Sequence, residues 1–254
     1  MPGQANINDQ AINERIIHIS GLRKAFGNNL VLNNLGLHLS EGENLAVLGK
    51  SGSGKSVLIK CIIGLMDADE GEIEVLGKPI DQLSSNELDR LRVDVGFLFQ
   101  SNALYDSMTV KENLEFPLRR HWMEISQQEM NELVEEALSN VGLPETMDMM
   151  PVELSGGMRK RIALARTMIL KPKIILYDEP TTGLDPVTSR EISELMMEVQ
   201  KKYKTSSLII SHDMKCIRHT ADRIVILIDG RCYAEGSYIE LEQSEDKKIN
   251  QFFQ

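Results

Sequence analysis

The fold of this chain is decided by the stretch Leu45-Ala46-Val47-Leu48-Gly49-Lys50-Ser51-Gly52-Ser53-Gly54-Lys55-Ser56-Val57. From Gly49 to Ser56 the stretch matches the phosphate-binding pattern G-x-x-x-x-G-K-[ST] at every fixed position. The apolar residues 45–48 predict a short buried strand before the loop, and the nearly all-apolar run 57–66 predicts a buried helix after it. We therefore expect a strand–loop–helix unit, rather than a Gly/Ser-rich turn before an ordinary helix.

This loop predicts the ligand because each residue type in it suits a phosphate chain. Glycines let the backbone fold around an anion, and the exposed N–H groups and the helix N-terminus attract phosphate. We expect Lys55 to reach the β- and γ-phosphates and Ser56 to offer its hydroxyl to Mg²⁺. The whole loop, from Gly49 to Val57, is the predicted binding site for the nucleotide.

Length, composition and charge limit the remaining possibilities. The 254 residues, 42% of them hydrophobic, suffice for one large domain or a domain with an insertion. A formal net charge of −10 disfavours nucleic acid or an anionic membrane surface as a direct partner. No apolar run is long enough to span a bilayer, and residues 1–13 show no signal-peptide pattern. The three cysteines are scattered, as expected of reduced thiols in the cytosol.

The order of predicted elements indicates an α/β fold with a helical insertion. Residues 16–19 and 35–39 read as strands of an antiparallel opening sheet, joined through 27–29. Residues 71–77 and 93–99 read as further strands, and the character is helical from about 104 to 170, where Leu133, Val134, Ala137, Leu138 and Val141 form an amphipathic stripe. Strands return at 174–177, 208–211 and 224–227, with a helix around 192–199 between the first two.

A pair of carboxylates follows the apolar strand at 173–177. Asp178 and Glu179 would lie at the carboxyl end of a parallel strand, where such sheets bind ligands, and hence beside the phosphate loop. We expect Asp178 to hold Mg²⁺ through water and Glu179 to polarise a water that attacks the γ-phosphate. The alternative is an acidic helix cap or turn before Pro180.

A second anion-binding nest is predicted at Ser155-Gly156-Gly157-Met158, where a serine and two glycines open a helix rich in Arg and Lys. A complete nucleotide loop together with a separate nest suggests that the nest of one subunit covers the nucleotide of another. A plain N-capped helix is the alternative.

Three further residues are candidates because of their positions at strand ends. Gln100 follows the strand that ends at 99 and can reach Mg²⁺ or the attacking water, and His212 follows the strand 208–211 and can bond the γ-phosphate. Phe26, ahead of Gly27, can stack on a base. The alternative is that Gln100 and His212 are ordinary surface residues and that Phe26 belongs to the core.

Over about residues 15–240 the chain resembles the ATP-binding cassette (ABC) ATPase subunit. The resemblance rests on the order along the chain of Phe26, the phosphate loop, Gln100, residues 154–158, Asp178-Glu179, Gly183-Leu184-Asp185 and His212. The resemblance implies one nucleotide-binding domain over 1–254: a core and N-terminal antiparallel β-subdomain at about 15–100 and 171–240, an inserted helical subdomain at about 101–170, and a tail at 241–254. It also implies a head-to-tail homodimer sandwiching two ATP molecules, with Phe26 on adenine, residues 155–158 on the partner's ATP, and Asp185 between sites. Met158 and Lys50 depart from the Gln and Pro of many members.

Met158 and Lys50, the two departures, both fit a subfamily. The runs Leu98-Phe99-Gln100-Ser101-Asn102-Ala103-Leu104-Tyr105 and Glu115-Phe116-Pro117-Leu118-Arg119 resemble the ATPase of Mla/Mce-type lipid transporters. The resemblance implies a subunit at the cytoplasmic face of the inner membrane, touching the membrane only through integral permease subunits and moving phospholipid or a related lipid between the inner and outer membranes. The permease would dock beside 103–119, with Tyr105, Phe116 and Leu118 as apolar anchors; the alternative is internal packing of the helical subdomain.

Other functions stay open at this point. The same kind of ATPase subunit could power the transport of another cargo, such as lipoproteins, peptides or amino acids. A soluble ABC ATPase of translation or DNA repair is disfavoured because the chain has one cassette and lacks a long coiled-coil insertion. A phosphate-loop GTPase or kinase is disfavoured because the chain contains no N-K-x-D and because Leu154-Ser155-Gly156-Gly157-Met158 has no role there.

Overall fold

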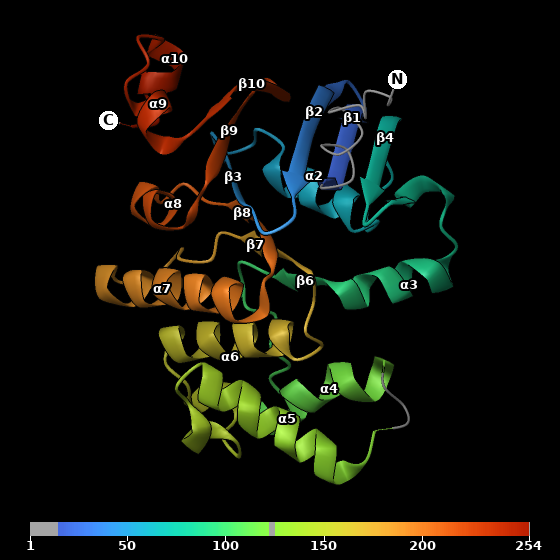
Figure 1. Cartoon of the computed structure of the whole chain (residues 1–254), viewed down its shortest axis with the longest axis vertical. Coiled ribbons are helices and arrows are strands. Elements are labelled where there is room, and N and C mark those ends of the chain that lie inside the picture. Colours follow the sequence, from blue (N-terminus) through green and yellow to red (C-terminus); the bar gives the residue numbers. More distant parts are fainter. Residues whose placement is uncertain (1–14, 122–124, 254) are drawn as a thin grey trace, which may run out of the picture. The chain divides into compact units, whose positions relative to one another are not determined.

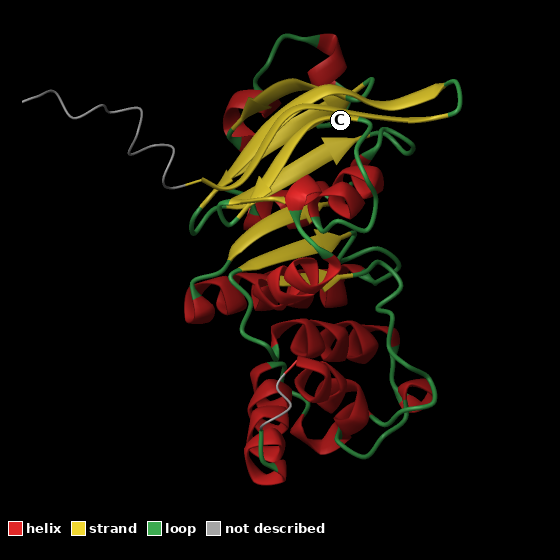
Figure 2. Cartoon of the chain, turned by 90° about the vertical axis from the view of Figure 1, so that its right-hand side faces the viewer, coloured by secondary structure: helices red, strands yellow, loops and turns green. Residues whose placement is uncertain are grey.

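The structure, a computed structural model, describes residues 15–121 and 125–253 and divides into two compact units. Among the described residues, the first unit holds 15–89, 206–208 and 221–253, and the second holds 90–121, 125–205 and 209–220. Strands dominate the first unit and helices the second (Figure 2). The predicted helical region 101–170 lies within the second unit, and the N-terminal stretch 1–13 lies outside the described residues.

The first unit opens with a hairpin of two long antiparallel strands, β1 (Arg15–Phe26) and β2 (Asn29–Ser40). With β4 (Glu70–Val75) and β5 (Lys78–Pro79) they form a sheet in the order β2-β1-β4-β5. Alternate residues face the core, as the buried pairs Ile17 with Leu39 and Ile19 with Leu37 show. The predicted antiparallel opening sheet is confirmed, with longer strands than the sequence pattern indicated.

A second set of strands carries the phosphate loop (Figure 1). The predicted strand at 45–48 is β3 (Asn44–Gly49), which is buried throughout and pairs in parallel with β9 (Arg223–Ile228). β10 (Arg231–Gly236) pairs antiparallel with β9. The short helices α9 (Tyr238–Glu242) and α10 (Lys247–Asn250) follow.

Several predicted boundaries are wrong, among them the strand predicted at 71–77, which is β4 and ends at Val75. The helix after the phosphate loop, α2 (Lys55–Ile62), ends four residues before 66, because Gly64 takes a left-handed conformation with φ of 62°. The strand predicted from 93 starts only at 95, because α3 (Ser85–Asp94) takes the two residues before it. Two elements, α3 and β8 (Ser206–Ile210), begin in the first unit and end in the second.

The second unit packs helices around one apolar core beside the parallel pair β6 (Val95–Leu98) and β7 (Ile174–Asp178). Its helices are α4 (Val110–His121), α5 (Gln127–Asn140), α6 (Gly156–Met168), α7 (Pro186–Tyr203) and α8 (Met214–Thr220), labelled in Figure 1. Three-residue 3₁₀ turns stand at Ile80–Gln82 in the first unit and at Pro144–Thr146 and Pro151–Glu153 in the second. The predicted stripe on α5 is buried except for Leu133, which is partly buried against the same core.

Within residues 15–121 and 125–253, no helix is long and apolar enough to cross a membrane.

Candidate nucleotide site and its family

The phosphate loop joins β3 to α2 in the predicted strand–loop–helix order. Two of its glycines are required by close backbone packing. A Cβ at Gly49 would meet Ser53 Oγ and the Leu227 carbonyl, and Gly54, with φ of 100°, lies where a Cβ would come within 2.8 Å of Leu32. Both positions leave space only for hydrogen, so the tight curve of the loop depends on these two glycines.

The polar side chains of the loop fit a phosphate ligand. Lys55 Nζ donates to the carbonyls of Gly49 (2.7 Å) and Lys50 (3.1 Å), so its ammonium group lies across the loop. Ser53 Oγ is buried and, within the described residues, makes no hydrogen bond. A phosphate oxygen would supply the missing partner. Ser56 stands exposed in the first turn of α2, where its hydroxyl is available to a metal ion held by phosphates.

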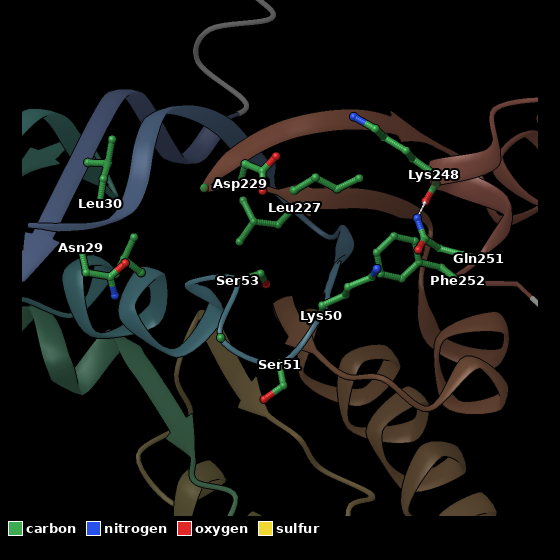
Figure 3. Close-up of a pocket in the computed structure, with 14 residues that line it drawn as sticks. Asn29, Leu30, Lys50, Ser51, Ser53, Leu227, Asp229, Lys248, Gln251 and Phe252 are labelled. Atoms are coloured by element: carbon green, nitrogen blue, oxygen red, sulfur yellow. Dashed lines mark hydrogen bonds between the residues drawn. The ribbon is translucent and has the colours of Figure 1, made fainter.

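A cavity of about 420 Å³ opens beside this loop within the first unit (Figure 3). Its walls are the loop residues 50–53, the start of β2 at 29–31, the β9–β10 turn at 227–230, and the C-terminal residues Lys248, Gln251 and Phe252. Phe26 does not line it; its ring is 48% exposed at the end of β1, with Lys24 Nζ 5.8 Å from the ring centroid. An exposed ring excludes the core alternative for Phe26 and leaves it free to stack on a base.

In the second unit, two of the predicted catalytic residues come together. Glu179 follows β7 and its carboxylate Oε2 lies 2.8 Å from His212 Nδ1 and accepts a hydrogen bond from Thr182 Oγ1 (3.0 Å). The Glu179 backbone has φ of 51° and its N–H donates to the Ile210 carbonyl (2.9 Å). The Glu179 carboxylate is therefore held in one orientation, and Asp178 stands beside it as the last residue of β7. The sequence placed both His212 and Glu179 at strand ends but did not predict their contact.

A residue that the sequence analysis missed lies against the predicted glutamine. Lys160 on α6 is 2% exposed, and its Nζ donates to the carbonyls of Gln100 (3.0 Å) and Phe99 (3.4 Å). Burial lowers the pKa of Lys160 to about 8, against the opposing attraction of the Asp178 and Glu179 carboxylates. The signal was available: Lys160 falls on the apolar stripe of α6, four residues before Leu164, where a surface lysine is not expected.

The Ser-Gly-Gly nest forms the N-terminus of α6. Ser155 Oγ accepts from the Met158 N–H (3.2 Å), so Ser155 is an N-cap, and both Ser155 and Gly156 are exposed. A Cβ at Gly157 would come within 2.6 Å of Thr188 Cγ2 on α7. Asp185 caps α7 by accepting from the Val187 and Thr188 N–H groups. The nest and Asp185 thus sit at two adjoining helix N-termini.

The predicted docking segment is partly exposed and partly core. Tyr105 (43% exposed) and Phe116 (37%) pack together with ring centroids 4.9 Å apart, and the Arg166 guanidinium lies 5.8 Å from the Tyr105 ring. Buried Asn113 fixes the segment by bonding the backbone N–H and carbonyl of Tyr105. Leu118, predicted as an anchor, is fully buried in the core of the second unit, so that prediction was wrong.

Comparison with known proteins identifies the family. The ABC transporter family profile matches residues 32–182. The chain is 36% identical over 241 residues to the intermembrane phospholipid transport ATP-binding protein MlaF of Haemophilus influenzae, covering 95% of this chain and 91% of that protein. It is 35% identical over 252 residues to the methionine import ATP-binding protein MetN of Campylobacter jejuni (93% and 75% covered). It is 38% identical over 236 residues to the probable ribonucleotide transport ATP-binding protein mkl of Mycobacterium tuberculosis (93% and 66% covered).

Comparison with solved structures leads to the same family. The dimeric ATP-binding cassette MJ0796, in a post-hydrolysis state bound to ADP and Pi, superposes with a TM-score of 0.79 at 32% identity, covering 87% of this chain and 98% of that one. The cbiO1 subunit of the cbiONQ transporter complex from Clostridium perfringens gives 0.83 at 29% identity, covering 94% and 95%. The predicted fold, an ABC ATPase core with an antiparallel β-subdomain and inserted helices, is confirmed. With a matched family profile and relatives covered over most of their length, the chain belongs to the ABC transporter family as an ATP-hydrolysing, ATP-binding subunit.

Proposed function

We propose that the phosphate loop, from Gly49 to Val57, binds the triphosphate of ATP, with Lys55 at the β- and γ-phosphates and Phe26 stacked on the adenine. The support is the buried Ser53 hydroxyl, which makes no hydrogen bond within the described residues, in a loop where Gly49 and Gly54 leave no space for a side chain. Ser56 would hold Mg²⁺, together with Gln100 and Asp178 through water. When bound, that ion would neutralise charge on the β- and γ-phosphates.

Hydrolysis is assigned to Glu179 as the general base that takes a proton from the attacking water. The observation that carries this assignment is the 2.8 Å contact between Glu179 Oε2 and His212 Nδ1. A carboxylate held by His212 and Thr182 points one lone pair in a fixed direction, which favours proton transfer. Because Nδ1 faces the Glu179 carboxylate, His212 would donate to the γ-phosphate from Nε2 only as the imidazolium, which carries a proton on each ring nitrogen.

We propose that the working enzyme is a homodimer, in which residues 155–158 of one subunit close over the ATP of the other and Asp185 lies between the sites. Exposed Ser155 and Gly156 at the start of α6 present free backbone N–H groups to an anion. The dimeric state of the related cassette MJ0796 supports this arrangement.

For the cargo, we propose phospholipid or a related lipid, moved between the inner and outer membranes by a complex that holds this subunit at the cytoplasmic membrane face. Integral permease subunits would contact the exposed Tyr105–Phe116 pair, which is aromatic and rimmed by Arg166. Support for a lipid comes from the likeness to MlaF and from the sequence run 98–105. The MetN relatives favour amino acid cargo as the second candidate.

The test is a native pull-down of the tagged chain in mild detergent, followed by mass spectrometry of proteins and lipids. Integral membrane subunits together with enriched phospholipid would support the proposal. A permease that brings a periplasmic amino acid-binding protein and no lipid above background would favour the second candidate. Recovery without any membrane protein would contradict a transport role.

A further inference from the structure

Residues 99–103 follow β6, include the predicted Gln100, and form a loop that we call the strap. Within it the Phe99 ring packs against Phe97, with ring centroids 4.0 Å apart, whereas Gln100 is exposed. An exposed side chain does not hold its own position, so the place of Gln100 depends on the backbone contacts of the strap. The strap and the helices that contact it, α4 and α6, all belong to the second unit.

The backbone of the strap is strained at two neighbouring residues. Asn102 has φ of 65° and Ala103 has φ of 51°, both in the left-handed region that residues with a side chain rarely adopt. An asparagine can support this conformation with its own side chain, but Asn102 Oδ1 is buried and makes no hydrogen bond within the described residues. Such strain persists only where the surroundings hold the backbone.

Two cations of α6 hold the carbonyl groups of the strap. Lys160 Nζ donates to the carbonyls of the first two strap residues. At the other end, Arg166 Nη1 donates to the Ala103 carbonyl (2.9 Å) and Arg166 Nη2 donates to the Asn102 carbonyl (3.1 Å). One planar guanidinium therefore binds both carbonyls of the strained pair, a geometry that the point charge of a lysine does not reproduce.

The surroundings of Arg166 suit a residue that fixes a backbone. Its further contacts are Asn113 Oδ1 (3.4 Å) and the Tyr105 ring, whose centroid lies 5.8 Å from the guanidinium. Among the described residues, its hydrogen-bond partners are carbonyl and amide oxygens and include no carboxylate. Burial lowers the pKa of Arg166, so keeping its charge there costs free energy that an exposed arginine does not lose.

We propose that Arg166 is a positioning residue for ATP hydrolysis, which together with Lys160 holds the strap in its strained conformation and so sets where Gln100 lies. The inference rests on the proposed function, in which Gln100 contributes to the Mg²⁺ site. α6 also begins at the nest, residues 155–158 (Figure 1). The helix that would close over a partner's ATP is therefore the helix that fixes Gln100.

The test measures steady-state hydrolysis by the full chain and, by calorimetry, its affinity for a non-hydrolysable ATP analogue. Arg166→Lys keeps the charge but loses the fork, so it should lower kcat by about tenfold or more while the Kd stays within about twofold of wild type. Arg161→Lys is the matched control, because Arg161 is a partly buried arginine of the same helix that donates to a carbonyl outside the strap, that of Val141. It should change kcat by less than about twofold.

A double-variant cycle with Gln100→Ala separates positioning from a general loss of structure. If Arg166 acts through Gln100, Arg166→Lys should change kcat by less than about twofold in the Gln100→Ala background. Equal effects of Arg166→Lys in both backgrounds would overturn the proposal, and so would a wild-type kcat in Arg166→Lys while Gln100→Ala is slow. A wild-type kcat in Gln100→Ala would instead count against the proposed role of Gln100 itself.

Ala103→Gly is the second variant, and it keeps the proposal testable where Arg166→Lys is less stable than wild type. Glycine adopts φ of 51° without strain, so the strap then needs less support from Arg166. Added to Arg166→Lys, Ala103→Gly should raise kcat by about threefold or more. A kcat that is not raised would show that Arg166 does not act by holding the strained strap, and the proposal would be overturned.

Discussion

Replacing Lys160 by methionine should slow ATP hydrolysis while leaving the protein folded and able to bind ATP. Lys160 donates to the carbonyls of Gln100 and Phe99 and is attracted by the Asp178 and Glu179 carboxylates. Methionine has similar length and fills the same apolar space, but it neither donates nor carries charge. The Gln100 backbone and the carboxylates then lose their common partner, and a displacement near 1 Å in such a site can cost about 10²-fold in rate.

The magnitude of the stability change follows from two opposed terms. A pKa of about 8 in the folded protein, against an ordinary value of 10.5, means that keeping Lys160 charged at pH 7 costs about 3 kcal/mol. Methionine removes that cost. It also leaves two buried carbonyls without a donor, at about 1–3 kcal/mol each. Two carbonyls together cost about 2–6 kcal/mol, so the free energy of unfolding should change by an amount between a gain of about 1 kcal/mol and a loss of about 3 kcal/mol.

The pH dependence gives an independent check with a definite sign. Because the folded-state pKa is lowered, the unfolded chain binds the Lys160 proton more tightly, and wild-type stability should rise with pH from about 8 to 10.5. The Lys160→Met variant lacks this term. Between pH 7 and pH 9 the wild type should therefore gain about 1 kcal/mol relative to the variant, measured by urea denaturation at both pH values.

The assays are steady-state hydrolysis, ATP binding and denaturation on the same preparations. We expect kcat to fall at least tenfold with the ATP Kd within twofold of wild type. Lys160→Gln, which keeps a donor without charge, should recover part of the rate, and Arg161→Met, a neighbour paired with Glu191 on the surface, should change it by less than twofold. An unchanged kcat in Lys160→Met, or a loss of more than about 4 kcal/mol of stability, would refute this reasoning, since the first removes the positioning role and the second makes Lys160 purely structural.

Three further outcomes test the site and the docking surface. Glu179→Gln should bind ATP normally but hydrolyse it about 10²- to 10⁴-fold more slowly, so turnover within threefold of wild type would remove Glu179 as the general base. Lys55→Ala should weaken ATP binding itself, measured by calorimetry, because it removes the charge at the phosphates. Tyr105→Asp should leave the chain folded, losing about 1–2 kcal/mol with the ring contact to Phe116, yet abolish co-purification with the permease; survival of the complex would place the docking site elsewhere.

The sequence predicted the elements whose signals are local. A continuous apolar run gave β3 before a complete phosphate motif, and two apolar stretches joined through 27–29 gave the hairpin of β1 and β2. Helix ends were less predictable: the apolar run after the loop continues past Ile62, and only the left-handed turn at Gly64 shows where α2 stops. The C-terminal helix α9 was missed, although its capping box, Ser237 with Glu240, is written in the sequence.

The errors in the candidate site have a common physical cause. Leu118 was taken for a surface anchor because it follows Phe116 in a recognisable run, yet Val110, Leu114 and Leu118 recur every fourth residue and form the buried stripe of α4. Lys160 was missed because a charged residue is presumed exposed. In both cases helical periodicity indicated burial, but the neighbouring sequence run suggested exposure for Leu118 and the charge suggested exposure for Lys160. The contact between Glu179 and His212 could not be predicted, because it depends on how two strand ends 33 positions apart meet.

That contact also determines which substitution can test Glu179. A non-glycine residue at φ of 51° is strained, by about 1 kcal/mol or more, and persists only where its surroundings hold it. Here the Ile210 carbonyl holds the backbone, and Thr182 and His212 hold the carboxylate. Glutamine keeps the size and an oxygen that can accept from Thr182, and it loses only the negative charge. Alanine would remove the carboxylate that contacts His212 and Thr182, so a lower rate could then be due either to the missing base or to the lost contacts. A rate loss in Glu179→Gln with ATP binding intact is therefore attributable to the missing base.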